Sequence, residues 1–432
     1  PEGTSLAAIR KQFPRAAIVW AHPYRDENRP PAVRLLNPLL DGIEIFSSNH
    51  SVLENSRGLQ DWHRYRFTAI GGTDTHAPSY AGTYPTIFDH PIATIEELAA
   101  ELRAGRCRHF VKEIPKAGTT STEVLDVTIG TKGADEVRER IIIKTQRSFG
   151  AWKSAERTFH VMRELGRRCF TEGTYRVPKA LGHDKESMSI FEEGVRGRSL
   201  FDTLVKADAQ DARRYLRMAA YWLARLHNCR LQITPPEEFL ESEEKRCGHY
   251  LNGFIENKHK QTRRVREIVE AVLDIERTLF QSHPERLTQG HGDFHPKNIY
   301  IGKDKPGNGE TTFVAAIDFS SSHCMPPAFD VGAFMAQFRN QFFHRPEVLE
   351  KFRGGRGDLS DGPAERLFLN TYLEAAEDIA LDFLSQVELF KARTGLSIAY
   401  YLLKVGMGDS EDLWRVLVDA ERALANFSAS KA

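Results

Sequence analysis

"HGDFHPKNIYI", residues 291–301, and "AAIDFSSSHCMPPAFDVGAF", residues 315–334, decide the fold of this chain. The first stretch passes into a strand at "NIYI", and the second begins with a strand that ends at "IDF". The polar segment between them contains Gly and Pro, which predicts the turn of a β-hairpin. Because the first strand's start and the second strand's end lie at one edge of an antiparallel pair, we expect Asn298 and Asp318 to meet there. Asp293 lies a short loop away.

This group of oxygen donors indicates phosphate chemistry. Carboxylate and amide oxygens suit Mg²⁺, which keeps several waters and binds substrate phosphates. Phosphoryl transfer combines a carboxylate base, an Asn and an Asp on the metal, and a lysine on the phosphates. Lys144 is the candidate lysine, because it ends the isoleucine run "RIIIK" and a buried charge there requires a partner.

The residues around this hairpin predict a small strand-rich lobe before a large helical lobe. "EVLDVTIG" and "RERIIIKTQ" predict adjacent strands, and "SMSIFEEG" predicts another. "SAERTFHVMRELG" predicts an amphipathic helix that ends at Gly166. From about residue 199 the chain is predicted to be mostly helical, apart from the hairpin.

Residues 1–112 alternate helical and strand-like patterns, which favours parallel α/β organisation. "TIEELAAELRAG" predicts a helix with Thr94 at its N-cap and Glu97 three residues later. His22, Asp74 and His76 follow predicted strands, where functional groups of parallel α/β folds gather, and they suit a hydrolytic metal site. Residues 113–122, "KEIPKAGTTS", predict a linker.

Composition limits the classes of partner. The 432 residues predict two or three domains, and 59 basic residues balance 59 acidic ones. We therefore expect neither nucleic acid nor a membrane as partner, and any charged partner must be bound through local groups. The five scattered cysteines suggest neither a zinc ribbon nor a disulfide framework, which favours a cytoplasmic location. No signal peptide is evident, and we expect the true N-terminus to lie upstream of Pro1.

The two opening motifs resemble the H-G-D-x-H-x-x-N and I-D-F…D-V pair of the aminoglycoside phosphotransferase and choline kinase family. "YWLARLHN" and "IFEEGVRGRSL" extend the resemblance over about residues 125–425. It implies an α+β protein-kinase-like fold, with an N-lobe at 123–196 and a C-lobe at 197–428, and transfer of phosphate from ATP to a small-molecule hydroxyl. It further implies that Asp293 is the catalytic base and that Asn298 and Asp318 hold Mg²⁺. His291 and Asp330 are implied as supports of the catalytic loop.

The resemblance also implies a nucleotide site. Lys144 matches the lysine that contacts the α- and β-phosphates, and Glu193 matches the adenine hinge. The family pairs its lysine with a helix glutamate, and here Thr158 stands at that position. Glu156 is the nearby candidate for this role.

Residues 1–112 resemble the second half of a PHP phosphoesterase domain, through "AHPYR", "LDGIEIF" and "GGTDTH". This resemblance implies a partial α/β barrel in which His22, Asp74 and His76, with Glu44 less securely, hold Zn²⁺ or Mn²⁺ in an intact parent. The family's early H-x-H is absent. We expect the partial domain to need packing against the kinase-like domain or a second copy.

Three functions remain open on sequence grounds. The leading prediction is a small-molecule kinase. The alternatives are a nucleotide-binding pseudokinase that regulates a PHP phosphoesterase, and a chain whose PHP part is itself the metal-dependent phosphoesterase.

Overall fold

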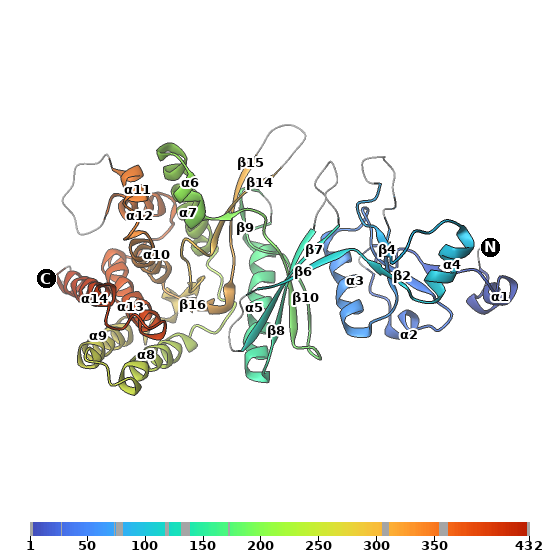
Figure 1. Ribbon diagram of the computed structural model, residues 1–432. Coiled ribbons are helices and arrows are strands. Elements are labelled where there is room, and N and C mark those ends of the chain that lie inside the picture. The colour runs from blue at the N-terminus through green and yellow to red at the C-terminus, as the bar shows by residue number, and fades with distance from the viewer. Residues whose placement is uncertain are drawn as a thin grey trace. The chain divides into compact units, whose positions relative to one another are not determined.

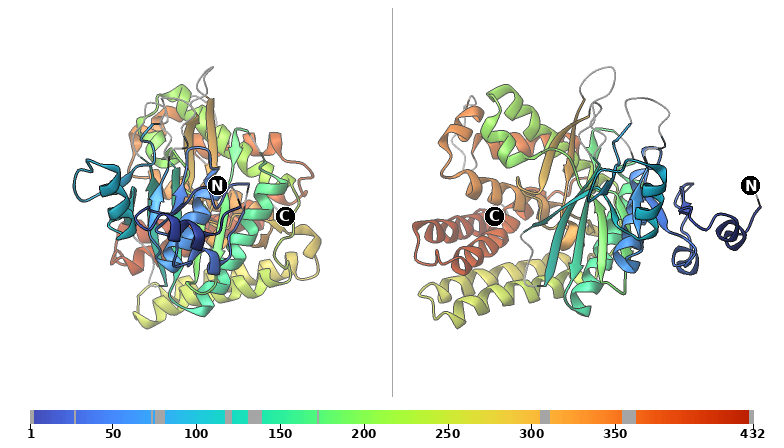
Figure 2. Two further views of the ribbon diagram at one scale, coloured as in Figure 1. Left: turned by 90° about the vertical axis from the view of Figure 1, so that its right-hand side faces the viewer. Right: turned by 45° about the vertical axis from the view of Figure 1, so that its right-hand side comes forward.

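The computed structural model describes residues 3–26, 28–72, 74, 81–116, 121–130, 139–171, 173–304, 311–353 and 362–429. This part of the chain separates into two compact units (Figures 1 and 2). Unit 1 is Pro1–Phe159 with Lys179–Gly194, and unit 2 is His160–Pro178 with Val195–Ala432. Within these described ranges, no helix is long and apolar enough to cross a membrane.

Unit 1 joins the N-terminal segment to most of the predicted strand-rich lobe. Its elements in chain order are α1 (Leu6–Gln12), β1 (Val19–Trp20), α2 (Ala32–Leu35), β2 (Gly42–Phe46), α3 (Val52–Tyr65), β3 (Ala69–Gly71), β4 (Thr86–Phe88), α4 (Ile95–Arg103), β5 (Cys107–His109), β6 (Val111–Lys116), β7 (Thr122–Ile129), β8 (Glu139–Gln146), the first half of α5 (Phe149–Arg168), β10 (Ala180–Asp184) and β11 (Ser189–Glu193).

The local predictions for unit 1 are mostly confirmed. Strands β1, β2 and β3 are parallel, as the α/β pattern predicts. The Thr94 hydroxyl caps α4 by accepting a hydrogen bond from the Glu97 amide. Strands β7 and β8 pair antiparallel. The predicted end of α5 at Gly166 is wrong, because α5 continues to Arg168. A helix tolerates an interior glycine at a cost of about 1 kcal/mol.

The predicted linker 113–122 is wrong in its first part. Residues 113–116 lie in β6, which pairs with β7 from Val111↔Ile129 to Lys116↔Val124. Strand β6 thus forms the edge of an antiparallel sheet in the order β10-β11-β8-β7-β6. Pro115 fits there because an edge strand can leave one N–H position unpaired. Proline and the following polar residues imitated a linker in the sequence.

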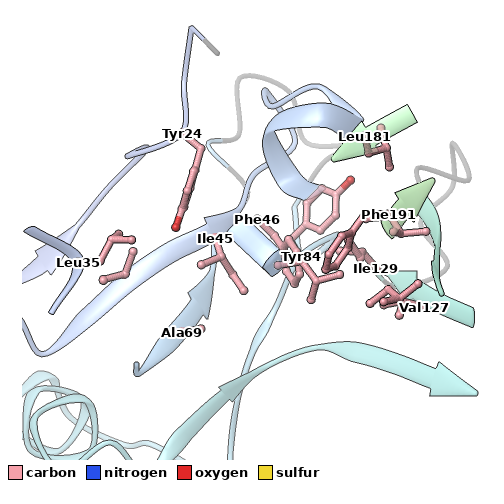
Figure 3. Packing of buried hydrophobic residues seen from close by; sticks show 14 residues of the cluster. Tyr24, Leu35, Ile45, Phe46, Ala69, Tyr84, Val127, Ile129, Leu181 and Phe191 are labelled. Carbon is pink, nitrogen blue, oxygen red and sulfur yellow. The ribbon is translucent and has the colours of Figure 1, made fainter. Parts of the chain in front are cut away.

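A hydrophobic cluster connects the N-terminal segment with this sheet. Ile45 and Phe46 on β2 belong to the same buried cluster as Val127 on β7 and Phe191 on β11. Figure 3 shows these side chains together with Tyr84. Burying such side chains stabilises a fold by about 1.5–3 kcal/mol each. The N-terminal segment and one face of the antiparallel sheet therefore share a core.

Unit 2 is the helical part, with a hairpin inserted in it. Its elements are the second half of α5, β9 (Tyr175–Arg176), β12 (Arg198–Ser199), α6 (Leu200–Lys206), α7 (Ala209–Asn228), α8 (Glu238–Glu256), α9 (Thr262–Phe280), β13 (Thr288–Gln289), β14 (Ile299–Asp304), β15 (Thr311–Ala316), β16 (Cys324–Met325), α10 (Pro327–Phe342), α11 (Pro346–Leu349), α12 (Pro363–Ala375), α13 (Phe383–Lys404) and α14 (Glu411–Ala429), with the short 3₁₀ helices η2 (Pro284–Arg286), η3 (Phe319–Ser321) and η4 (Glu350–Phe352).

Two features of unit 2 bear on the sequence analysis. The predicted hairpin is confirmed as β14 and β15, which pair antiparallel from Ile299↔Ala316 to Asp304↔Thr311. The scattered cysteines suggested no disulfide framework, and the structure has one disulfide in the described residues, between Cys169 and Cys229. Sixty residues separate these two cysteines in the chain, so their spacing gave no signal. Helices α8, α9, α13 and α14 lie side by side (Figure 2).

Candidate active site

The loop "GHGDFHPKN", residues 290–298, joins β13 to β14 in unit 2. Its glycine is required by both backbone conformation and space. Gly292 has φ of 80°, a region that favours glycine, and a Cβ there would lie 2.1 Å from the Ser321 carbonyl oxygen. The close approach of the two segments holds Asp293 at the turn of the loop.

Asp293 keeps a partly open carboxylate. Its side chain is 43% exposed, and its Oδ2 lies 3.5 Å from His295 Nε2. The Asn298 side-chain amide donates to Asp293 Oδ2 at 3.0 Å and to its backbone oxygen at 3.1 Å. Desolvation acts to raise the pKa of Asp293, but His295, His291 and Asn298 outweigh it and hold this pKa below its usual range. The carboxylate is therefore ionised and accessible.

The hairpin brings the candidate metal ligands to one edge, as the sequence predicts. The Ile317 amide donates to the Asn298 carbonyl at 2.8 Å, so Asp318 follows directly beside Asn298 in the backbone. Asp318 has φ of 65° and ψ of 72°, in the left-handed region. Such a conformation costs an ordinary residue about 1–3 kcal/mol and is concentrated at functional sites.

The loop is supported from behind by His291 and Asp330. Both side chains are buried, and Asp330 Oδ2 and Oδ1 accept the backbone amides of His291 and Gly292 at 2.7 and 2.8 Å. His291 Nδ1 accepts from the Asp293 amide, and its Nε2 donates to the Ile317 carbonyl. Burial lowers the pKa of His291, which favours the neutral ring that these two bonds need. The predicted supporting contacts are therefore present.

A histidine that the sequence analysis did not place in the site completes this support. His227 lies near the end of α7. Its Nε2 lies 3.2 Å from Asp330 Oδ2, and its Nδ1 lies 2.8 Å from the Tyr372 hydroxyl. Burial would raise the pKa of Asp330, but His227 and the His291 amide outweigh it and lower this pKa. The Leu-His end of "YWLARLHN" was noted as a family feature, but its partner lies 103 residues away in the chain.

The nucleotide-site candidates lie in unit 1. Lys144 on β8 pairs with Glu192 on β11, with 2.9 Å between Nζ and Oε1. Glu193 is the last residue of β11, and its backbone amide donates to the Lys179 carbonyl at 2.9 Å. Glu156 is exposed on α5, apart from the contacts of Lys144. No signal in the sequence indicated Glu192 as the partner of Lys144, because the resemblance implies a partner on a helix and Glu192 lies on a strand.

The N-terminal candidates form a different arrangement. His22 Nδ1 lies 2.8 Å from Glu44 Oε2, and its Nε2 lies 3.7 Å from Asp74 Oδ2. Arg25 also pairs with Asp74, and the Asn49 amide donates to Asp74 Oδ2 at 2.8 Å. His76 lies outside the described residues. Among those that are described, no group of three or more His, Cys, Asp or Glu residues is arranged to hold a metal ion.

Comparison with known families now identifies the larger part of the chain. The model described as "Phosphotransferase enzyme family" matches residues 130–369, more than half of the sequence. The chain belongs to this phosphotransferase family. The predictions of the family and of an enzyme that transfers phosphate to an alcohol group are confirmed at this level. The strand-rich and helical parts of a kinase-like fold are confirmed as well.

A second family model and several solved structures are also similar to parts of this phosphotransferase. The model described as "PHP-associated" matches residues 53–107, in support of the second resemblance. No curated protein matches the chain. Similar solved structures include the ethanolamine kinase of Plasmodium vivax, at 16% identity and a TM-score of 0.47, covering 73% of this chain and 81% of that one. The choline kinase of Cryptosporidium parvum Iowa II has 12% identity and a TM-score of 0.49, covering 74% and 91%. A putative aminoglycoside phosphotransferase of Ralstonia eutropha JMP134 has 14% identity and a TM-score of 0.47, covering 74% and 93%.

Proposed function

We propose that this phosphotransferase transfers the γ-phosphoryl group of ATP to a hydroxyl of a small molecule, with Mg²⁺ as cofactor. The observation that carries the proposal is the loop that presents Asp293 beside Asn298, with Asp318 next to it across the hairpin. These are the residue types that phosphoryl transfer requires of its base and its metal ligands.

Asp293 is the proposed general base. Its lowered pKa keeps it ionised at neutral pH, and its partial exposure leaves room for an acceptor hydroxyl. A hydrogen bond from Asn298 fixes the carboxylate so that it can orient the hydroxyl and accept its proton. Positioning of this kind is the main contribution of a protein to phosphoryl transfer.

The donor set at the hairpin edge fits Mg²⁺. The side-chain amide nitrogen of Asn298 is directed to Asp293, which leaves its Oδ1 for a metal, and Asp318 adds a carboxylate. Magnesium prefers such oxygen ligands, and when bound it would neutralise charge on the phosphates. We propose Asn298 and Asp318 as its protein ligands.

Lys144 and Glu193 are the proposed nucleotide contacts, the first on the α- and β-phosphates and the second at the adenine. Lys144 is held by Glu192, which supports a defined position for its ammonium. Glu156 has less support, because it is exposed and pairs with neither of them in the described structure.

Asp293→Asn is the decisive test. Turnover of ATP with a panel of hydroxyl acceptors should fall about 10²- to 10⁴-fold, the usual contribution of a general base. Affinity for ATP and the melting temperature should remain near those of the unchanged chain. Asp304→Asn, on the same hairpin and paired with Arg176, is the matched control. Full turnover by Asp293→Asn would exclude Asp293 as the base.

One observation keeps a second function in view. Helix α5 supplies no glutamate to Lys144 in the described structure, which is a departure expected of a nucleotide-binding pseudokinase that regulates a PHP phosphoesterase. ATP binding without ATP consumption, across a broad acceptor panel, would favour it.

The PHP-type part has a more limited proposal. We propose that parallel strands β1–β3 and helix α3 are a portion of a PHP barrel, on the support of the match at residues 53–107. Among the described residues, the surroundings of Asp74 do not fit a Zn²⁺ or Mn²⁺ site, because Arg25 and Asn49 already engage its carboxylate.

A further inference from the structure

The sheet face that carries Lys144 receives no carboxylate from the helix packed on it. Trp152, Ala155 and Phe159 of α5 form a buried apolar cluster with Ile190, the residue directly opposite Lys144 in the sheet. Thr158, at the position expected for glutamate, donates its hydroxyl to the Ser154 carbonyl at 3.0 Å. The packed surface of α5 is thus apolar near this lysine.

A strand residue provides the charge instead. Strands β8 and β11 are antiparallel, with Ile190 opposite Lys144 and Glu192 opposite Ile142. Glu192 and Lys144 are therefore diagonal neighbours on one face of the sheet, within reach of long side chains. Their charged atoms lie 2.9 Å apart, and the side chains of Lys144 and Glu192 are only 18% and 6% exposed.

The buried carboxylate of Glu192 lowers the stability of the fold, which is unfavourable at a position with only a structural role. Its Oε2 is buried and has no hydrogen-bond partner within the described structure. A buried oxygen without a hydrogen-bond partner destabilises a fold, and replacing both partners of a buried ion pair with apolar residues is often neutral or stabilising. An apolar side chain would pack against Ile190 without this cost, which indicates that the carboxylate serves Lys144.

We propose that Glu192 is the positioning residue of the nucleotide site, holding the Lys144 ammonium in place of the family's helix glutamate. This inference rests on the proposed function. In protein kinases, helix position controls the equivalent ion pair. Here both partners belong to adjacent paired strands, so the pair forms without any requirement on the position of α5.

The test measures ATP affinity, kcat, KM for ATP and melting temperature for the full chain. Glu192→Gln and Glu192→Met should each lower kcat/KM for ATP by about tenfold or more. Glu192→Met should melt at a lower temperature than the unchanged chain, because it leaves the half-buried Lys144 ammonium without this carboxylate, whereas the double variant Lys144→Met/Glu192→Met should recover most of that loss. Glu123 lies on β7 of the same sheet and pairs with Arg147 at 2.8 Å, and Glu123→Gln should leave kcat/KM unchanged.

A double-mutant cycle gives the readout that a structural role would not affect. If Glu192 acts through Lys144, adding Glu192→Met to Lys144→Met should cause little further loss in ATP affinity. Full kcat/KM in Glu192→Met, or additive losses in the cycle, would overturn the inference. If the unchanged chain binds ATP but does not consume it, the proposed function fails. The cycle in ATP affinity then still decides the role of Glu192.

Discussion

Two of the described clusters that combine aspartate and histidine, those of Asp74 and Asp293, differ in what lies against the aspartate. Asp74, near His22, is paired with the guanidinium of Arg25 and with Asn49. Asp293 Oδ2 accepts a hydrogen bond from the neutral side-chain amide of Asn298, and it lies 3.5 Å from His295 Nε2. An arginine already provides a cation at the first cluster, whereas the Asp293 carboxylate is partly exposed and forms no ion pair with an arginine among the described residues.

Backbone strain does not separate these clusters. His22 and Asp74 have positive φ values of 51° and 41°, and Asp318 has 65°. All three lie in a region that ordinary residues rarely adopt. The informative difference is therefore the identity of the partner side chains, and four experiments test how far it extends.

The largest expected effect concerns packing in the N-terminal segment. Phe46 is 1% exposed in the core shared with the antiparallel sheet, whereas His22 has a quarter of its side chain exposed. Phe46→Ala should lower the free energy of unfolding by about 3–5 kcal/mol, because it leaves a cavity. His22→Ala should cost much less. Chemical denaturation of both variants would contradict this view if His22→Ala proved the more damaging change.

Asp318→Asn compared with Asp74→Asn addresses the clusters directly. Loss of the proposed metal carboxylate should reduce kcat by about 10²- to 10³-fold, since charge stabilisation is usually a large part of catalysis. Asp74→Asn should leave kcat within about twofold, because its carboxylate is held by Arg25. Steady-state rates over a range of Mg²⁺ concentrations measure both. Equal losses in the two variants would remove the distinction drawn between the clusters.

The contribution of a third carboxylate, Asp330, should be measurable as a dependence of stability on pH. Its pKa is lowered in the folded protein, so its contribution to stability is present above the unfolded value of about 3.9 and is lost as pH falls through the folded value. Asp330→Asn should lose about 1.5–3 kcal/mol at pH 7 and show a weaker acid dependence below pH 4. Denaturation curves from pH 7 to pH 3 provide the measurement. An unchanged acid slope would argue against the described hydrogen bonds.

The smallest effect should come from Arg25→Ala. Arg25 is 41% exposed, and exposed ion pairs contribute little, so the melting temperature should change by no more than about 2 °C. The informative readout is Mn²⁺ or Zn²⁺ binding by calorimetry. Appearance of metal binding only in Arg25→Ala would show that the guanidinium occupies the place of the cation. Strong metal binding by the unchanged chain would refute the account of Asp74.

The sequence predicted the geometry of the loop at 290–298 and its hairpin for a physical reason. Hairpin geometry ties Asn298 to Asp318, and steric demand ties Gly292 to its position, so spacing along the chain is informative. Partners far apart in sequence were not accessible in this way. His227 meets Asp330 over 103 residues, and Glu192 meets Lys144 only because β11 lies beside β8.

For strand β6 the sequence-based prediction was wrong. Pro115 and the polar residues after it predicted a linker, yet tertiary pairing with β7 overrode local composition. The same limitation hid the disulfide of Cys169 and Cys229. The hairpin was thus easier to predict from the sequence than the boundary between the N-terminal segment and the antiparallel sheet.

Strand β6 also has a consequence for how the chain can be divided. It covers the edge of β7 along residues 124–129, and the segment before it contributes Ile45 and Phe46 to the shared core. Deleting this segment together with β6 would leave the edge of β7 unpaired and expose an apolar face of the sheet, and both features promote aggregation. The two regions should therefore be difficult to separate: a chain that begins after β6 should aggregate more readily than the full chain, whatever chemistry the N-terminal segment has kept.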